Sequence, residues 1–404
     1  MSFQQGLSGL SAASQNLDVI GNNVANANTV GFKESQALFA DVYANSLAAS
    51  GSTGAGIGVS VAAIQAQFSQ GNVRTTSNPL DVAINGRGFF RMENNGSVSY
   101  SRNGQFHLDK DGYVVNAGGN KLTGFGVDAL GNLMIGNPLP LQLSTAQLQA
   151  TATTQSNIGM NLDAREAIIS KPFSLTDPTT YNKATSMTVY DSLGNPHALA
   201  TYFVKTAANT WKVQGAVDGT SIGLLGTLQY KSDGSIDRLG SGLPYSVSVA
   251  LTNGATTPFN FTVDFPNSTQ YGSGFSVDAL KQDGYTSGML SGYNVSEDGL
   301  VLGRYSNGAS RTLGQIQLAN FTNPEGLQPL GGNLFAETSA SGQSIPGTPG
   351  ASNFGVLQSG AVEESNVDLT QELVNMITAQ RVYQANAQTI KTQDQVLNTL
   401  VNLR

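Results

Sequence analysis

Both ends of the chain carry apolar residues at the spacing of an α-helix. From Phe3 the apolar positions advance in steps of four and three residues, which places them on one helical stripe. A helix over this stripe would be roughly 35 Å long at about 1.5 Å per residue. The stripe consists of Phe3, Leu7, Leu10, Leu17, Ile20 and Val24.

The C-terminal segment 365–404 continues the same alternation over about five heptads. Ser365, followed three residues later by Asp368, predicts the N-terminus of this second helix. The helix would run roughly 55 Å. Its candidate assembly residues are Leu369, Leu373, Met376, Ile377, Tyr383, Ile390, Leu397 and Val401.

Between these ends, short alternating runs separated by turn signals predict β-structure. The run Leu80–Met92 alternates and turns at residues 86–88, and further short runs and turns continue to Val115. This spacing predicts an antiparallel meander. The central region repeats the pattern, and the strands predicted there are Ala184–Tyr190, Leu199–Lys205, Trp211–Val217 and Phe259–Phe265.

The predicted fold is mainly β with terminal α-helices and two nested antiparallel β domains. Two small, glycine-rich and aperiodic segments, 44–59 and 340–355, predict linkers between the helical ends and the β-structure. The predicted domains are a terminal helical domain (1–30 and 360–404), a linker or extended segment (31–70), a first β domain (71–145 and 285–359) and an inserted β domain (146–284).

Composition narrows the possible functions. The chain has 404 residues, which exceeds the usual size of one domain. Only 12% of residues are charged and the formal net charge is −7, so nucleic acid is an unfavourable partner. With 39% apolar residues the chain is not disordered throughout. The absence of cysteine excludes disulfides, thiolate metal sites and cysteine nucleophiles.

Membrane insertion and Sec export are both unsupported. No apolar run approaches the roughly 20 residues that span a bilayer. The N-terminus, MSFQQGLSGL, lacks the basic and apolar regions of a signal peptide. Taken alone, this evidence predicts a cytoplasmic protein.

Three segments resemble motifs of the bacterial flagellar rod and hook proteins, an axial family. Leu17–Lys33 (LDVIGNNVANANTVGFK) is similar to the signature near their N-termini, and segment 365–404 is similar to the hook C-terminus. Tyr100–Phe106 (YSRNGQF), followed by LDKDGYVVNAGG, resembles their β-domain motif. The large insertion at 146–284 resembles hook rather than rod members.

This resemblance implies that the terminal helices pair, like a coiled coil, in the core of a tubular polymer. The first β domain would lie outside that core and the inserted domain outermost. The implied function is a structural, non-enzymatic subunit of a flexible universal joint that transmits torque from rod to filament. The implied partners are copies of itself, rod, hook-cap and hook–filament junction proteins, and the export apparatus, with no cofactor and no membrane insertion.

The resemblance also changes the predicted location. It implies export by the flagellar type III apparatus without a cleaved signal peptide, and hence an extracellular place in the hook. This overrides the cytoplasmic prediction.

The helical ends need partners to be stable. Burying about seven apolar residues contributes on the order of 10–20 kcal/mol, whereas ordering some 35 residues costs at least about 1 kcal/mol each. A lone helix of this kind is marginal even with its hydrogen bonds. We therefore hypothesise that both ends are disordered in the monomer and fold on assembly.

Asparagines and a Gly-Phe pair mark the exit from the first helix. Asn22, Asn23 and Asn26 are candidate caps that end the helix and orient the segment after it. Gly31 and Phe32 are candidate anchors for the chain as it leaves the helical core.

Candidate catalytic and metal motifs are weak. Asp109–Gly112 resembles the start of a calcium loop, but residue 120 is Asn where a Glu is needed, so a hairpin turn is favoured. Gly54–Gly58 lacks the strand, lysine and helix start of a phosphate loop. His107 and His197 are predicted to be structural. We predict no catalytic residue and no metal site.

Two alternatives remain open. One is a distal rod subunit of the same axial family. The other is a secreted β-rich adhesin or carbohydrate-active protein, which leaves the paired terminal helices unexplained. Curved tubes, straight tubes or globular particles of the purified protein would distinguish the hook, the rod and this last class.

Overall fold

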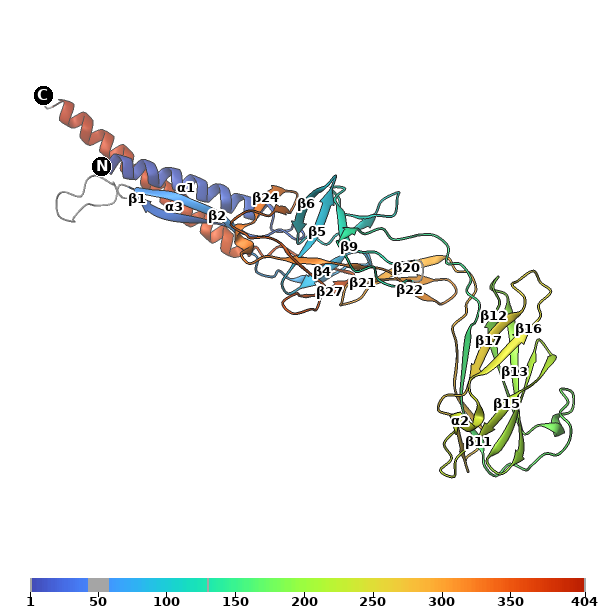
Figure 1. The fold of residues 1–404 in the computed structure, drawn as a ribbon. Helices are drawn as coiled ribbons and strands as arrows, with labels where there is room; N and C mark the ends of the chain where they lie inside the picture. The colour runs from blue at the N-terminus through green and yellow to red at the C-terminus, as the bar shows by residue number, and fades with distance from the viewer. Residues whose placement is uncertain (1, 43–57, 129–130, 403–404) are drawn as a thin grey trace. The chain divides into compact units, whose positions relative to one another are not determined.

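The computed structural model describes residues 2–42, 58–128 and 131–402 (Figure 1). The fold is mainly β with one long helix at each end, α1 (Ser2–Ala25) and α3 (Leu369–Asn402), which confirms that prediction. Most of the predicted glycine-rich linker 44–59 lies outside the described residues.

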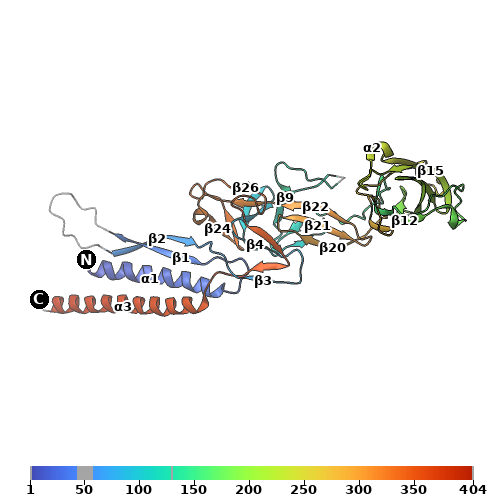
Figure 2. The same cartoon turned by 90° about the horizontal axis from the view of Figure 1, so that it is seen from below.

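Helices α1 and α3 lie side by side (Figures 1 and 2). They are antiparallel, since the start of α1 lies near Ile390 and its end near Glu372. The carboxylate of Asp368 accepts hydrogen bonds from the N–H groups of Thr370 and Gln371 and so caps α3. The helix therefore begins after Asp368, and the cap predicted at Ser365 is wrong, because the carboxylate satisfies the free N–H groups of the first turn.

A β-hairpin covers α1 where the sequence predicted a linker over 31–70. Strands β1 (Ser35–Val42) and β2 (Gly58–Ala66) pair antiparallel from Ser35–Ala66 to Val42–Gly58. Small and polar residues dominate both strands, so their alternation is weak and pairing was not predicted. The described residues of this predicted linker or extended segment thus form a paired β-hairpin.

The chain divides into two compact units, and unit 1 comprises residues 1–145, 292–303 and 311–404. Its largest sheet has the order β20, β21, β22, β9, β5, β6, β25, β24. The bounds are β20 Leu290–Val295, β21 Leu300–Tyr305, β22 Ser310–Ile316, β9 Lys121–Phe125, β5 Phe89–Asn94, β6 Ser97–Ser101, β25 Leu334–Ala336 and β24 Gln328–Gly331.

Shorter strands extend this sheet or form separate pairs, and a 3₁₀ turn, η2 (Pro324–Gly326), precedes β24. The strands joined to the sheet are β7 His107–Leu108, β8 Val114–Val115, β10 Leu139–Pro140, β23 Leu318–Asn320 and β26 Ile345–Gly347. The separate pairs are β4 Val82–Asn85 with β27 Val356–Ser359, and β3 Val73–Thr75 with β28 Ala361–Glu363.

The predicted simple meander is wrong in its connections. β5 and β6 do form a hairpin, but β4 pairs with β27, and the other neighbour of β6 is β25. Strands from the C-terminal half of the chain thus flank the N-terminal strands β9, β5 and β6 on both sides. Alternation is a local signal and cannot identify a partner so far away in the sequence.

The predicted second linker, 340–355, is instead part of this body. Its strand β26 pairs with β23, and the N–H of Gly355 donates to the carbonyl of Arg87 at 2.7 Å. The ring of Phe354 packs directly on Gly347, where a Cβ would leave no room. The glycines here permit close packing rather than mobility.

Unit 2 comprises residues 146–291 and 304–310. One sheet has the order β16, β17, β11, β18 with β19 beside β11, and the other has the order β12 to β15. A 3₁₀ turn, η1 (Pro178–Thr180), and a short helix, α2 (Arg238–Ser241), complete it. The bounds are β11 Gln155–Asp163, β12 Lys183–Tyr190, β13 Pro196–Ala207, β14 Thr210–Val217, β15 Thr220–Gln229, β16 Tyr245–Val249, β17 Phe259–Asp264, β18 Thr269–Tyr271 and β19 Ser276–Gln282.

The four strands predicted for this region are confirmed as β12, β13, β14 and β17. The prediction of a purely antiparallel domain is wrong, because β11 runs parallel to β17 and β18. A long connection between β11 and its partners permits the parallel pairing, which no hairpin could form. Trp211, Phe203 and Phe265 are fully buried in the core of the unit.

Candidate self-assembly surface

Small residues form the contact between α1 and α3, which we call the seam. A Cβ on Gly6 would lie 3.1 Å from Cγ1 of Ile390, and one on Gly9 would lie 2.9 Å from Oδ1 of Asn386. Ala13 and Ala379 are also buried, with 6% and 5% of their surface exposed. The glycines therefore let the two helices approach closely, and little large apolar surface is buried between them.

Most of the predicted apolar stripe of α1 lies outside the seam. Phe3 and Leu7 are 45% and 53% exposed, whereas Ile20 is buried. Leu10, Leu17 and Val24 are partly buried. The predicted residues therefore face more than one direction, and only Ile20 is fully covered within the chain.

The predicted residues of α3 are more exposed still. Met376 and Ile390 are partly buried. The side chain of Val401 lies outside the described residues. The remaining predicted residues are between 37% and 54% exposed: Leu369, Leu373, Ile377, Tyr383 and Leu397.

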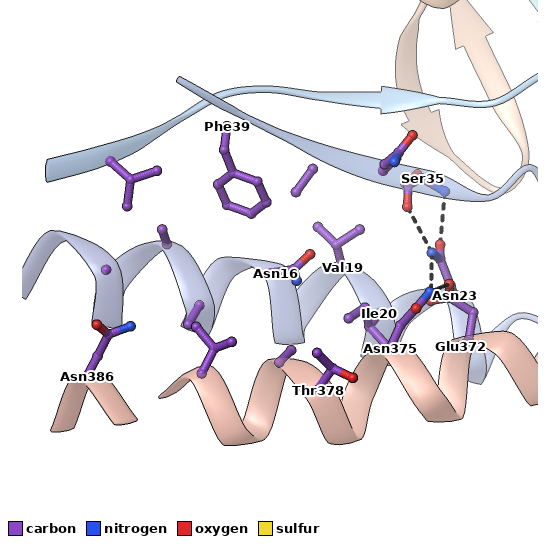
Figure 3. Close-up of a pocket in the computed structure, with 18 of the residues that line it drawn as sticks. Asn16, Val19, Ile20, Asn23, Ser35, Phe39, Glu372, Asn375, Thr378 and Asn386 are labelled. Atoms are coloured by element: carbon purple, nitrogen blue, oxygen red, sulfur yellow. Dashed lines mark hydrogen bonds between the residues drawn. The ribbon is translucent and has the colours of Figure 1, made fainter. Parts of the chain in front are cut away.

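A groove of about 750 Å³ lies between α1, α3 and the β1–β2 hairpin (Figure 3). Val19 and Ile20 contribute apolar surface, and Phe39 extends toward it from β1. Amide side chains, among them Asn16 and Asn386, line it as well. This mixed lining suits contact with another amphipathic element.

Asn23, which lines this groove, connects three elements (Figure 3). Its Nδ2 donates to the carbonyl of Ser35 at 2.8 Å, and its Oδ1 accepts from the N–H of Ser35 at 2.9 Å. Nδ2 also lies 3.3 Å from Oε2 of Glu372 on α3. Asn23, which is 1% exposed, therefore ties α1 to β1 and α3 and does not cap the helix as predicted.

Asn22 and Asn26 do close the end of α1. Nδ2 of Asn26 donates to both the carbonyl and the Oδ1 of Asn22, at 3.0 and 2.8 Å. The backbone N–H of Asn26 also donates to the carbonyl of Asn22. These bonds satisfy the carbonyl group of Asn22 in the last turn.

Gly31 and the partly buried Phe32 follow this turn. Gly31 has a φ of 72° and donates its N–H to the carbonyl of Glu363 at 2.8 Å. A Cβ there would lie 2.6 Å from the backbone of Asn103. Only glycine fits this position without strain, and it brings the segments beside both helices together.

The place where Asn23 joins α1 to β1 and α3 is called the junction below. Glu34 and Glu372 bring two carboxylates to this junction. Burial, and next the negative charge of Glu372, raise the pKa of Glu34. A raised pKa means that the folded junction holds this proton more tightly than the unfolded chain. Its contribution to stability is therefore present at low pH and lost as pH rises through the folded pKa.

Lys33, Arg102 and Glu363 form a buried ion cluster beside the junction. Nζ of Lys33 lies 2.7 Å from Oε1 of Glu363, and both side chains are fully buried. NH1 of Arg102 lies 3.7 Å from Oε2 of Glu363. Burial lowers the pKa of Lys33, and the charge of Glu363 opposes that effect. The cluster joins the segment after α1, the segment before α3 and the β-structure of unit 1.

Several of these residues were not predicted. Gly6 and Gly9 could have been noticed as small residues three apart on one helix. Lys33 lies inside the N-terminal motif, but its ion partner is 330 residues away. Glu372 and Asn386 are polar residues within the seam or groove, where apolar periodicity gives no signal.

The weak chemical motifs of the sequence form ordinary structure. Oδ1 of Asp109 accepts from the N–H groups of Asp111 and Tyr113, which makes a hairpin turn. Across the described residues no group of His, Asp and Glu side chains is arranged to hold a metal ion. Over the same residues, no helix is long and apolar enough to cross a membrane. Gly54–Ile57 lies outside the described residues.

Comparison with protein-family models places four segments of the chain among flagellar proteins. Residues 3–33 match the model "Flagella basal body rod protein", and residues 358–403 match "Flagellar basal body rod FlgEFG protein C-terminal". Residues 83–171 match "Flagellar hook protein FlgE/F/G D1 domain", and residues 161–285 match "Flagellar basal body protein FlaE D2 domain". Paired terminal helices on a β body, with these matches, define an axial protein of the bacterial flagellum.

Full-length relatives narrow this class to one family. The flagellar hook protein FlgE of Salmonella typhimurium is 46% identical, and that of Escherichia coli K12 is 45% identical, each over the whole of both chains. The flagellar hook protein FlgE of Borreliella burgdorferi is 32% identical over 100% of this chain and 99% of its own. The chain therefore belongs to the flagellar hook protein family.

A solved structure shares the fold. The flagellar hook protein FlgE2 of Helicobacter pylori superposes with a TM-score of 0.52 at 14% identity, covering 70% of this chain and 99% of that one. At this identity the likeness concerns the fold alone.

Proposed function

We propose that this chain is a structural subunit of the bacterial flagellar hook and polymerises with copies of itself. The observation that carries the proposal is apolar surface left uncovered on both terminal helices. This surface, which we call the outer faces of α1 and α3, comprises Phe3, Leu7, Leu373, Val374, Ile377, Val396 and Leu397, each between 45% and 54% exposed.

Exposed apolar side chains grouped on paired helices favour association with another chain. Fully burying a large aliphatic side chain contributes about 1.5–3 kcal/mol. A half-exposed side chain such as Leu373 or Ile377 would therefore contribute about 1 kcal/mol when a neighbour covers it. Extensive exposed apolar surface on a soluble protein marks interaction sites.

The proposed domains have the bounds predicted from the sequence, and the division of the chain into two compact units supports them. A terminal helical core (1–30 and 360–404) would form the inner part of the polymer, with 31–70 joining it to a β domain (71–145 and 285–359). An inserted β domain (146–284) would lie outermost. Unit 2, with residues 146–291 and 304–310, corresponds closely to this insertion and has its own buried core.

The proposed polymer is a flexible tube that acts as a universal joint. It would transmit torque from the basal-body rod to the filament, with rod, hook-cap and hook–filament junction proteins as neighbours. The location would be the extracellular hook, reached through the flagellar type III apparatus. No catalytic role or cofactor is proposed. Full-length identity to hook proteins supports this role over that of a distal rod subunit.

Electron microscopy under precipitating salt tests the proposal. The full chain should form curved tubes, and the chain lacking residues 365–404 should not, because it has lost α3 and its outer face. Straight tubes would favour the rod alternative. Monodisperse particles from the full chain would contradict self-assembly.

A further inference from the structure

Three connections of unit 2 meet at one buried imidazole ring. His197, 8% exposed, lies near the start of β13. Asp191 comes from the turn before β13, and Asp218 comes from the turn between β14 and β15. Asn253 comes from the connection between β16 and β17. These residues are far from the outer faces of α1 and α3 in sequence and belong to the other compact unit.

Each ring nitrogen of His197 faces a carboxylate. Nδ1 lies 2.6 Å from Oδ2 of Asp218, and Nε2 lies 3.3 Å from Oδ2 of Asp191. The same Oδ2 of Asp191 accepts from Nδ2 of Asn253 at 2.6 Å. The ring of Phe259, on β17, lies 6.2 Å away. The two aspartates are the charged groups that face the imidazole.

Asp191 also holds the backbone of its own turn, and Asp218 holds the backbone of β13 next to His197. Oδ1 of Asp191 accepts from the N–H groups of Leu193 and Asn195, each at 2.9 Å. Oδ1 of Asp218 accepts from the N–H of Ala198 at 2.8 Å. A change at the ring would therefore act on this backbone through side chains that already hold it.

This arrangement favours the protonated ring. Imidazolium donates from both nitrogens, whereas neutral imidazole donates from one and presents a lone pair at the other. Loss of the proton would leave one carboxylate facing a lone pair, and would leave two negative charges without the cation between them. Asp191 is fully buried, so it cannot turn to water, whereas the side chain of Asp218 is 51% exposed.

We propose that His197 is a proton-operated clamp that holds these three connections of unit 2 together while it is protonated and loosens them when it loses the proton. The contact between His197 and Asp218 breaks first, because the carboxylate of Asp218 already has access to solvent.

The direction of the pH dependence follows from the surroundings of the ring. Burial alone would lower the pKa of His197, but hydrogen bonds and charges from Asp218 and Asp191 outweigh it and raise the pKa. The folded unit thus binds this proton more tightly than the unfolded chain. The stabilisation is fully present below the unfolded pKa of about 6.5 and is lost as pH rises through the higher folded pKa.

The composition of the chain allows a direct measurement of this proton. It has only two histidines, and the other, His107, is exposed on β7. Selective labelling of histidine Cε1 in the unpolymerised full chain gives two resonances, assigned with His107→Gln. The His197 resonance should titrate with a midpoint above about 6.5, and Asp218→Asn should lower that midpoint. A midpoint at or below that value, or one that Asp218→Asn leaves unchanged, would overturn the clamp.

The single tryptophan allows stability to be measured for unit 2 separately. Trp211 is buried in the core of unit 2, so its fluorescence reports the unfolding of that unit in the full chain. The urea midpoint of the wild type and of the control His107→Gln should fall from about pH 6 to about pH 9. The midpoint of His197→Gln should stay level over this range. The same dependence of the urea midpoint on pH in all three proteins would refute the proposal. If His197→Gln does not fold, Asp218→Asn, which changes the exposed carboxylate, takes its place in the test.

Discussion

At the scale of single residues, the buried ion cluster is unbalanced. Lys33 and Arg102 bring two cations against the one carboxylate of Glu363. Oε1 of Glu363 additionally accepts from the N–H of Gly71 at 3.0 Å. The carboxylate therefore has more partners than either cation, and removal of its charge leaves both cations uncompensated in a buried site.

Glu363→Gln should consequently impair assembly more than Lys33→Met. The glutamine variant leaves two unpaired buried cations, and breaking such a pair costs about 3–5 kcal/mol. Its critical concentration for polymerisation should rise by about two orders of magnitude or more. Lys33→Met keeps Arg102 beside Glu363 and should have a smaller effect. Sedimentation of salt-induced polymer measures both, and the reverse order would contradict this view of the cluster.

Gly31 offers a second test at this scale. Alanine there would combine the strain of a positive φ with a clash against the backbone of Asn103. Gly31→Ala should destabilise the junction by more than the roughly 1–3 kcal/mol of backbone strain alone. Gly96→Ala is the matched control, because Gly96 has a φ of 85° but open space around its Cβ position. Equal critical concentrations for the two variants would show that the close approach is unimportant.

Sequence reasoning identified the location of the junction but not its chemistry. Asn22 and Asn26 act locally, so a short motif was enough to predict their role at the end of α1, whereas Gly31 acts through the distant Glu363 and Asn103. Asn23 has the same residue type and neighbourhood as Asn22, yet its partners lie on β1 and α3. Such a role depends on which distant segments come together, and no local pattern contains that information.

At the scale of elements, the two terminal helices bury little in each other. Glycine and alanine form the seam, and the large apolar side chains remain on the outer faces. Periodicity predicted both helices correctly because it is a local property of about 3.6 residues per turn. It did not predict the seam, because small residues form the seam and the periodicity of large apolar residues carries no signal for them.

The helices should therefore be largely unfolded in a dilute monomer. Their mutual contact is too small to offset the conformational entropy of two long helices. Far-UV circular dichroism should show less helix than α1 and α3 would give, and the missing signal should appear on polymerisation. Full helicity in the dilute monomer would contradict coupled folding and assembly.

At the scale of the whole molecule, unit 2 has its own core, and hydrogen bonds join the two ends of its main segment. The N–H of Leu148 donates to the carbonyl of Gly288 at 2.8 Å, and the N–H of Gly288 donates back at 3.1 Å. The two segments that flank residues 149–287 thus meet as an antiparallel pair. The repeated pattern of short strands predicted an inserted β domain here, but the parallel pairing of β11 depends on distant partners and was not predicted.

Replacing residues 149–287 with an Asn-Gly turn should leave assembly intact. Leu148 and Gly288 already face each other, and Asn-Gly is a favourable two-residue hairpin turn. The shortened chain should still form tubes by electron microscopy, with altered curvature. Loss of all polymer from a shortened chain that still folds would show that the insertion is required for assembly.

The central claim is that the outer faces of α1 and α3 hold the polymer together. Leu373→Gln combined with Ile377→Gln changes two half-exposed side chains one turn apart on α3. Leu239→Gln, at a 94% exposed leucine on α2, is the matched control. The measurement is the critical concentration of each protein in a sedimentation assay.

At about 1 kcal/mol for each side chain, the double variant should raise the critical concentration at least about tenfold. The control should match the wild type. Polymerisation of the double variant at the wild-type concentration would contradict the claim.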